Sequence, residues 1–303
     1  FNDTRDDVTN ENLHSQWESA KDKYDNFSGQ QMVKIYTSGS LLEDREIPLE
    51  FQETVLRECH ELGKELIVES RCEQLSEKKL AWATALNPSF TVAIGLEAYD
   101  DEVLRFHINK GFSTKAWDRA VENLRKFNLR VKTYLMFKPP FMSEKDALDH
   151  GVRWIIDVAS RSDEISVNPM NIQRGTIIDR LHRHNEYRPP WLWSLVEMIK
   201  QAHPHIYPEG GVNGSPDQIC RLIVHPTAGG KVRGAHNCGS CDKFVVAAIE
   251  RYAVSGDLRE FDGLSCECKT IWQAELALES ALPLPLGISQ SRRGNRIENL
   301  RSL

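Results

Sequence analysis

The sequence lacks long apolar stretches and a secretory leader. No apolar run approaches the roughly 18–20 residues that a membrane-spanning helix needs, so we expect no membrane partner. Residues 1–7 are polar and acidic, unlike the basic region and apolar core of a signal peptide. The formal net charge of −6 argues against a uniformly basic nucleic-acid-binding protein, although it leaves room for a local basic surface.

The chain also has few cysteines, and they are unevenly spread. Four of the seven form a cluster, whereas Cys59, Cys72 and Cys220 stand alone. A reducing compartment with one metal site explains this distribution better than a disulfide framework, which is typical of short secreted chains. We therefore expect a cytoplasmic protein. Because the first residue is Phe1 and not methionine, we also expect the fold to begin upstream of it.

Strand and helix patterns alternate from residue 31 onward, after a polar segment over residues 1–30 that predicts a surface segment or a loosely ordered arm. Short β-rich runs predict strands over 32–37, 65–71, 91–97, 130–137 and 164–168. Amphipathic stretches between them predict helices over 48–62, 76–86, 114–127 and 143–160. Such alternation indicates a parallel sheet built from βαβ units. Periodicity alone does not decide between a closed barrel and an open sheet.

The alternation weakens after residue 180, which suggests a second part of the chain. The stretch over 188–193 starts a predicted helix that runs to about Ala202, and another helix is predicted from Asp242 to Ser255. We place a boundary near residue 205. The predicted organisation is an arm, an α/β domain, a smaller C-terminal domain and a basic tail, over residues 1–30, 31–204, 205–288 and 289–303.

Polar and glycine residues gather where the predicted strands end. They are Ser38, Gly39, Ser40, Glu69, Arg71, Gly95, Glu97, Lys138 and Asn168. The carboxyl ends of parallel strands carry the active site in barrels and in open α/β sheets. A turn after any strand favours serine, glycine and asparagine, so a single turn would mean little. Five strands with this feature, and charges that we expect to be half-buried, favour the functional interpretation.

The cysteine cluster has the spacing of a structural metal site. Cys238 and Cys241 form a CxxC turn, and Cys266 and Cys268 form a CxC pair after the helix predicted to start at Asp242. Two thiolate pairs on either side of a helix suit a tetrahedral structural zinc ion. His225 or His236 could replace one sulfur, and buried or redox-active thiols remain the alternative.

The ordered set of strand-end motifs carries a family resemblance. It comprises KIYTSGS (34–40), VESR (68–71), AIGLE (93–97), INKGF (108–112), YLMFKPPF (134–141), VNPMNIQRGT (167–176), YRPPWLW (187–193) and RGAHNC (233–238). This order resembles the Elp3-like branch of the radical S-adenosylmethionine enzymes, and within it the radical subunits of archaeosine synthase. The resemblance covers nearly the whole chain. It implies an α/β fold, namely a partial (β/α) barrel of the radical type with a small C-terminal zinc-binding domain.

The resemblance also implies a reaction and its participants. The cofactors would be S-adenosylmethionine and a [4Fe-4S] cluster, with an electron donor as partner. The reaction would be scission of a C–N bond that converts a lysine-modified 7-deazaguanine in tRNA to archaeosine. A lysine-transferring subunit would install the lysine beforehand. Another Elp3-like radical modification of tRNA is an alternative.

One departure from the family pattern concerns the cluster. Its CxxxCxxC motif does not occur in the 303 residues, whereas Phe1-Asn2-Asp3 resembles the residues that follow that motif. We expect the cluster loop to lie upstream of Phe1. The alternative is a non-catalytic, tRNA-binding scaffold subunit that has lost the cluster.

Residue by residue, the resemblance implies two groups of contacts. Those to S-adenosylmethionine would involve Ser38, Gly39, Ser40, Glu69, Arg71, Gly95 and Glu97. Those to the substrate would involve Lys138, Asn168 and Gln173. For the tRNA backbone, the candidates are His182, Arg183, His184, Arg188 and the arginines of the tail, although these side chains equally suit a solvated charged face.

Overall fold

The computed structural model describes residues 8–36, 39–207 and 220–281. The chain forms two compact units, the first made of Phe1–Gly95 and Lys115–Lys132, the second of Leu96–Thr114 and Thr133–Leu303. Ser38 and the basic tail over 289–303 lie outside the described residues. The division expected near residue 205 stays a prediction. Among the described residues, no helix has the length and apolar character needed to cross a bilayer.

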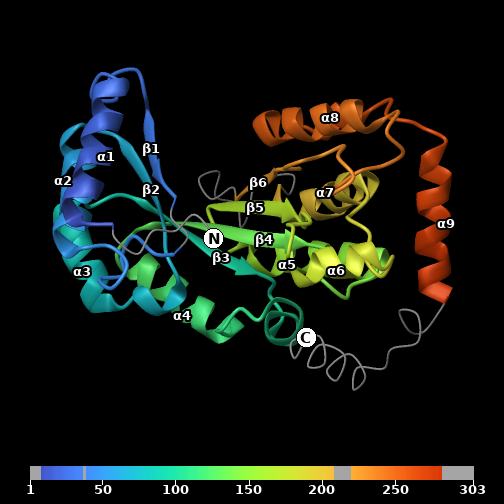
Figure 1. The fold of residues 1–303 in the computed structure, drawn as a ribbon, viewed down its shortest axis with the longest axis horizontal. Helices are drawn as coiled ribbons and strands as arrows, with labels where there is room; N and C mark the ends of the chain where they lie inside the picture. Colours follow the sequence, from blue (N-terminus) through green and yellow to red (C-terminus); the bar gives the residue numbers. More distant parts are fainter. Residues whose placement is uncertain (1–7, 37–38, 208–219, 282–303) are drawn as a thin grey trace. The chain divides into compact units, whose positions relative to one another are not determined.

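A six-stranded parallel sheet, a half-barrel, organises the fold, and its strands follow one another in chain order (Figure 1). The strands are β1 (Met32–Ile35), β2 (Glu65–Glu69), β3 (Thr91–Glu97), β4 (Arg130–Phe137), β5 (Glu164–Pro169) and β6 (Arg221–Val224). Parallel pairing places Val33 opposite Leu66 and Ile165 opposite Leu222. The α/β partial barrel expected from the sequence is confirmed, and β6 is an additional strand that the sequence analysis missed.

The helices of the first unit cover buried apolar strands. They are α1 (Asn10–Lys23), α2 (Leu49–Glu61), the 3-10 turn η1 (Cys72–Gln74), α3 (Glu77–Leu86) and α4 (Thr114–Lys126). Ser76 caps α3 by accepting a hydrogen bond from the backbone N–H of Lys79. Helix α4 buries Trp117, Val121 and Leu124 on one face, as its amphipathic pattern predicts.

Within the segment expected to be a surface segment or a loosely ordered arm, residues 10–23 form helix α1, whose side chains are exposed or half-buried except at Trp17. A capping box joins Thr9 to Asn12 at its start. Its one buried side chain, Trp17, donates a hydrogen bond from Nε1 to Oε2 of Glu58 in α2 over 2.7 Å. A helix that buries one residue has almost no apolar periodicity, so the sequence pattern could not reveal it.

The second unit contains the remaining helices. They are the π-helix η2 (Val103–Ile108), α5 (Glu144–Ala159), α6 (Ile177–Arg183), α7 (Leu192–Ile206), α8 (Asp242–Ser255), the 3-10 turn η4 (Leu258–Phe261) and α9 (Cys268–Ala281). Helices α5 and α7 pack against each other. The packing at Gly151 of α5 is close, because a Cβ there would lie 3.0 Å from the Phe137 ring and 3.1 Å from the Met198 sulfur. Trp154 and Trp193 are fully buried in this core.

Candidate functional site

Ser40 ties together the ends of the first two strands in the first unit. Its buried hydroxyl accepts a hydrogen bond from the backbone N–H of Arg71 over 2.7 Å. The backbone N–H of Leu41 donates to the carbonyl of Glu69 over 3.0 Å. The structure therefore brings Ser40, Glu69 and Arg71 to one edge, as the sequence motifs predict. Glu69 is half-buried, but Arg71 is exposed and paired with Glu73, which corrects the expectation that it is half-buried.

A carboxylate that the sequence analysis missed lies beside this turn. Oε2 of Glu46 accepts a hydrogen bond from the Ser40 backbone N–H over 2.7 Å. A Cβ on Gly39 would lie 1.7 Å from the same oxygen, so a larger residue there would displace the Glu46 carboxylate from this position. Nothing in the sequence pattern links Glu46 to the strand end, because the contact depends on how the loop folds back.

In the second unit, two strand-end residues carry side chains on a left-handed backbone. Glu97 at the end of β3 has φ 73°, and Lys138 directly after β4 has φ 57°. Such backbone costs energy for residues other than glycine and is often found at functional sites. The Glu97 carboxylate lies 3.0 Å from Nζ of Lys110, a second residue that sequence analysis did not single out. Lys110 follows the π-helix η2, a type of helix that is also enriched at functional sites.

Lys138 is engaged in a buried ion pair. Its Nζ lies 2.6 Å from Oε2 of Glu144, and the two side chains are 6% and 0% exposed. The other oxygen of Glu144 accepts a hydrogen bond from the backbone N–H of Trp191 over 2.8 Å. The hydroxyl of Tyr187 donates to the Lys138 carbonyl over 2.8 Å. In this structure the Lys138 ammonium group pairs with Glu144 at the start of α5. The expected contact between Lys138 and a substrate stays a prediction.

The remaining substrate candidates lie at the end of β5. Asn168 belongs to the strand and is half-buried, whereas Gln173 is exposed in the loop after it. The candidates for tRNA contact differ in exposure. Arg183 and His184 are exposed, but Arg188 is half-buried, with its guanidinium 3.8 Å from the centre of the Trp191 ring.

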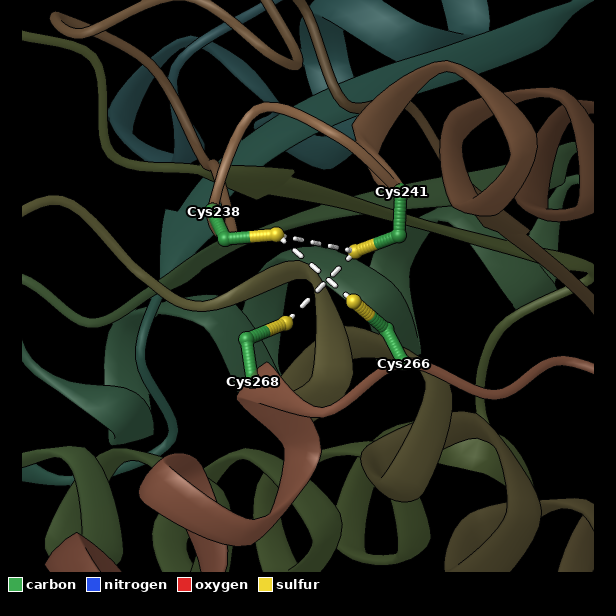
Figure 2. Close-up of side chains that lie close together, drawn as sticks. All are labelled: Cys238, Cys241, Cys266 and Cys268. Carbon is green, nitrogen blue, oxygen red and sulfur yellow. Dashed lines mark hydrogen bonds between the residues drawn. The ribbon is translucent and has the colours of Figure 1, made fainter.

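The four clustered cysteines form one compact centre, and Figure 2 shows their sulfurs pointing toward one another. Cys238 and Cys241 lie on the turn before α8, whereas Cys266 and Cys268 lie at the start of α9. All four Sγ atoms are within 4.8 Å of one another. The sulfurs of Cys238 and Cys266 are 3.6 Å apart, as are those of Cys241 and Cys268.

These separations fit four ligands of a single metal ion. Sulfurs bound tetrahedrally to one zinc ion at about 2.3 Å would lie about 3.8 Å apart. A disulfide would instead require about 2.05 Å. No histidine belongs to the gathered group in the part of the chain that the structure describes. His236 instead has Nδ1 2.8 Å from the carbonyl oxygen of Gly234.

N–H groups from neighbouring side chains support the sulfurs. Trp193 Nε1 donates to the Cys268 sulfur over 3.3 Å, and Asn237 Nδ2 donates to the Cys241 sulfur over 3.3 Å. Such donors stabilise thiolate charge and orient the ligands of a metal. Cys241 and Cys268 are buried, whereas Cys238 is exposed.

In the chain without a bound metal ion, Cys238 is expected to be the most reactive thiol. Hydrogen bonds from the backbone N–H groups of Cys241 and Ser240 lower the pKa of Cys238 to about 6. Burial raises the pKa of Cys59 to about 12. Because the thiolate is the nucleophile, alkylation of Cys238 by iodoacetamide should rise through pH 6 and level off by pH 7–8. Peptide mass spectrometry over a pH series measures this rate. Cys59 should stay unmodified, and added zinc should protect Cys238 from alkylation. If the rate of Cys238 alkylation reached half its maximum only above pH 8, the expectation would be contradicted.

Helix α9 connects this centre to the core of the second unit. Trp272 Nε1 donates to Ser194 Oγ over 2.8 Å, and Glu275 accepts from Trp191 Nε1 over 2.8 Å. Oε2 of Glu279 accepts from the backbone N–H of Lys145 over 2.7 Å, which caps the start of α5. The cysteines therefore fix one end of a helix whose other end holds α5.

The family resemblance implies three bound groups, namely S-adenosylmethionine, a [4Fe-4S] cluster and a zinc ion, and the residues of the chain can be compared with each. In the first unit, the turn at Gly39 and the half-buried Glu69 offer a small surface and a carboxylate, and the second unit offers Glu97. In each unit taken by itself, a carboxylate of this kind can accept hydrogen bonds from ammonium and hydroxyl groups. The four-cysteine centre suits a single ion, and no CxxxCxxC loop occurs in the 303 residues. The ligands that the family pattern assigns to the iron–sulfur cluster are therefore not among the 303 residues.

Comparison with known proteins gives both sequence relatives and a fold. The chain is 34% identical over 276 residues to archaeosine synthase subunit beta of Methanosarcina acetivorans, covering 89% of this chain and 75% of that protein. It is 33% identical over 270 residues to the protein of the same name from Thermococcus kodakarensis, covering 88% and 80%. The Elp3 structure from Methanocaldococcus infernus superposes with a TM-score of 0.57 at 16% identity, over 82% of this chain and 60% of that one. No family model matches the chain.

Proposed function

This chain belongs to the family of archaeosine synthase beta subunits, and we propose that it is a radical S-adenosylmethionine component of a tRNA-modifying enzyme. The observation that carries the proposal is this relationship, which extends over 89% of the chain. The Elp3-like half-barrel supports it, because the carboxyl ends of parallel strands are where (β/α) barrels carry their active sites.

The finer proposal is a lyase reaction. The chain would act on a 7-deazaguanine that carries a lysine, break a C–N bond and leave archaeosine. The name "subunit" of the relatives implies a partner protein, which we propose to be the subunit that installs the lysine. An electron donor is a further proposed partner.

The chain's own residues would hold S-adenosylmethionine, which supplies the 5′-deoxyadenosyl group for the radical chemistry. The turn at Gly39 and Ser40 would face its amino acid end through backbone groups. Glu69 and Arg71 would meet its ribose and carboxylate. Gly95 would let the adenosine lie against β3, and Glu97 would contact the same ligand. Asn168 and Gln173 would face the modified base, and Lys138 would contribute by holding the end of β4.

We also propose that the four-cysteine centre holds a structural zinc ion. Four sulfurs leave no open position for a substrate or a catalytic water, which is typical of structural sites. The ion would keep α9 attached to α5 and α7. Metal analysis of protein purified without added zinc should find one zinc ion per chain, and one iron per chain would contradict the choice of metal.

Substitution of Glu97 tests the proposed cofactor site. Glu97→Gln keeps the size of the side chain on the same backbone but removes its charge and its ion pair with Lys110. We expect S-adenosylmethionine to bind at least about tenfold more weakly, which corresponds to about 1.4 kcal/mol. Equilibrium dialysis measures the affinity. Glu102→Gln, at an exposed position just before η2, is the matched control and should bind as the unaltered chain does. Equal affinity of the two variants would remove Glu97 from the site.

The reaction itself is tested anaerobically. The full-length protein and the family's partner subunit are incubated with S-adenosylmethionine, a reductant, and tRNA that carries the lysine-modified base. We expect archaeosine in the digested tRNA and 5′-deoxyadenosine in the supernatant, both detected by mass spectrometry. Binding of tRNA without 5′-deoxyadenosine would instead support a scaffold role, and 5′-deoxyadenosine with another modified nucleoside would support a different radical modification.

A further inference from the structure

Two segments of the second unit, far apart in sequence, lie side by side after β5 and β6. The backbone N–H of Ile172 donates to the carbonyl of Arg233 over 2.8 Å. In return, Nε of Arg233 donates to the carbonyl of Ile172 over 3.1 Å. These bonds join the loop after β5 to the loop that leads from β6 to Cys238.

A buried carboxylate organises arginines from both segments. Oδ1 of Asp179 lies 2.6 Å from Arg233, and its Oδ2 lies 2.6 Å from Arg183. The backbone N–H of Gly175 also donates to Asp179, over 3.0 Å. The Asp179 side chain is only 2% exposed, whereas those of Arg183 and Arg233 are 66% and 36% exposed. Asp179 therefore fixes two guanidinium groups next to each other while leaving them open to solvent.

The same two segments carry further positive charges. We use the name basic surface for five cationic residues, namely Arg174, Arg180, Arg183, Lys231 and Arg233. All are exposed except Arg233, which is half-buried. The acidic residues of the same two segments are Asp179, whose oxygens are used within the protein, and Glu186. The concentration of positive charge contrasts with the net charge of −6 for the whole chain.

The position of the basic surface relates it to the substrate edge. Its first segment follows β5, the strand that carries Asn168, and its second segment runs from the end of β6 to Cys238. The loop that carries Lys231 and Arg233 is thus anchored by the sheet at one end and by the four-cysteine centre at the other. A ligand held on this surface would lie beside the carboxyl end of β5.

We infer that the basic surface binds the phosphate backbone of the RNA substrate, an inference that rests on the proposed function. Arginine is suited to this because its planar fork offers paired donors to phosphate oxygens. Asp179 would hold two of these forks in place before binding, which lowers the entropy lost when they meet a phosphate.

The composition favours RNA over a protein partner. The centres of protein interfaces are rich in aromatic residues and poor in lysine. Among the described residues of the two segments, the large apolar side chains that are exposed are Ile177 and Val232, both aliphatic. Five cations, with no exposed Phe, Tyr or Trp among the described residues of these segments, match backbone recognition, in which charge supplies most of the affinity.

Binding of an unmodified tRNA transcript, measured by fluorescence anisotropy at 50 and 200 mM salt, tests the inference. For Arg183→Ala/Arg233→Ala we expect the affinity for tRNA to fall about ten- to a hundredfold at the lower salt concentration. The slope of log affinity against log salt concentration should also become shallower, by about the amount that two phosphate contacts contribute. Arg174→Ala/Lys231→Ala, which leaves the contacts of Asp179 intact, should show a similar loss and guards against misfolding of the first variant. Arg251→Ala, at an exposed arginine of α8 paired with Glu260, is the matched control and should bind like the unaltered protein.

The outcomes separate the inference from the proposed function. If the unaltered protein does not bind tRNA, the proposed function fails. If it binds and both double variants match Arg251→Ala, the basic surface is not the RNA contact. If the double variants bind tRNA normally but no longer bind the partner subunit, the inference is overturned, and the basic surface contacts an acidic protein surface instead.

Discussion

Removal of the zinc ion proposed for the four-cysteine centre is expected to lower the apparent Tm of the protein by about 10 °C. Binding of zinc by four-ligand peptide sites is worth about 10–16 kcal/mol. We take about a quarter of that free energy as the stabilisation of the folded protein. At about 2–4 °C of Tm per kcal/mol for a domain of this size, this gives a shift of about 10 °C. The centre has a large effect because it anchors α9, whose Trp272, Glu275 and Glu279 contact α5 and the start of α7.

The experiment compares thermal unfolding before and after treatment with a zinc chelator. Cys241→Ser should reproduce the loss without a chelator, because Cys241 is a buried member of the group. Cys59→Ala, at a buried cysteine of α2 outside the group, should keep the metal and unfold close to the unaltered protein. Equal melting with and without bound metal would show that α9 is held by its other contacts.

Glu144→Ala is expected to destabilise the protein by about 3–5 kcal/mol. The change leaves the Lys138 ammonium buried without its partner and the backbone N–H of Trp191 without its acceptor. An uncompensated buried charge costs about that much. Urea unfolding followed by tryptophan fluorescence measures the loss, since Trp154 and Trp193 are buried in the same unit.

Two further variants test whether the loss of stability in Glu144→Ala comes from the unpaired Lys138 charge or from lost packing. Replacing both partners, as Lys138→Met/Glu144→Leu, should recover much of the stability, because neither residue is then a charge in an apolar interior. Asp149→Ala removes the partner of Lys145 in an exposed pair on the same helix and should cost less than about 1 kcal/mol. If Glu144→Ala and Asp149→Ala cost the same, the buried pair does not hold the end of β4.

Most of the sheet could be predicted from the sequence, because buried parallel strands have a strong local pattern. The ranges predicted for the strands Thr91–Glu97 and Arg130–Phe137, and for the helix Asp242–Ser255, agree with the structure. Two short elements were missed, the four-residue β6 and the seven-residue α6, which includes the buried, polar Asp179. Helix α9 buries little besides Cys268 and Trp272, so it too lacks a clear apolar stripe.

The site shows where sequence reasoning stops. The four-cysteine centre could be predicted, because metal ligands keep recognisable spacing. The partners of the strand-end residues could not be predicted, since Glu46, Lys110 and Glu144 meet them only after the loops have folded. The roles of Gly39, Glu69 and Asn168 toward a cofactor or a substrate stay predictions.

The cap that Glu279 places on the start of α5 has a consequence for the order of folding. The two contacting segments are separated by 134 residues of sequence, so their hydrogen bond closes a long loop. During synthesis, β4 and the start of α5 leave the ribosome long before Cys266, Cys268 and Glu279 do. Non-local contacts of this kind form late, and chains that depend on them stay open to aggregation in the meantime. The second unit should therefore reach its final packing only after translation has passed residue 279, and zinc capture would be the last step of its maturation.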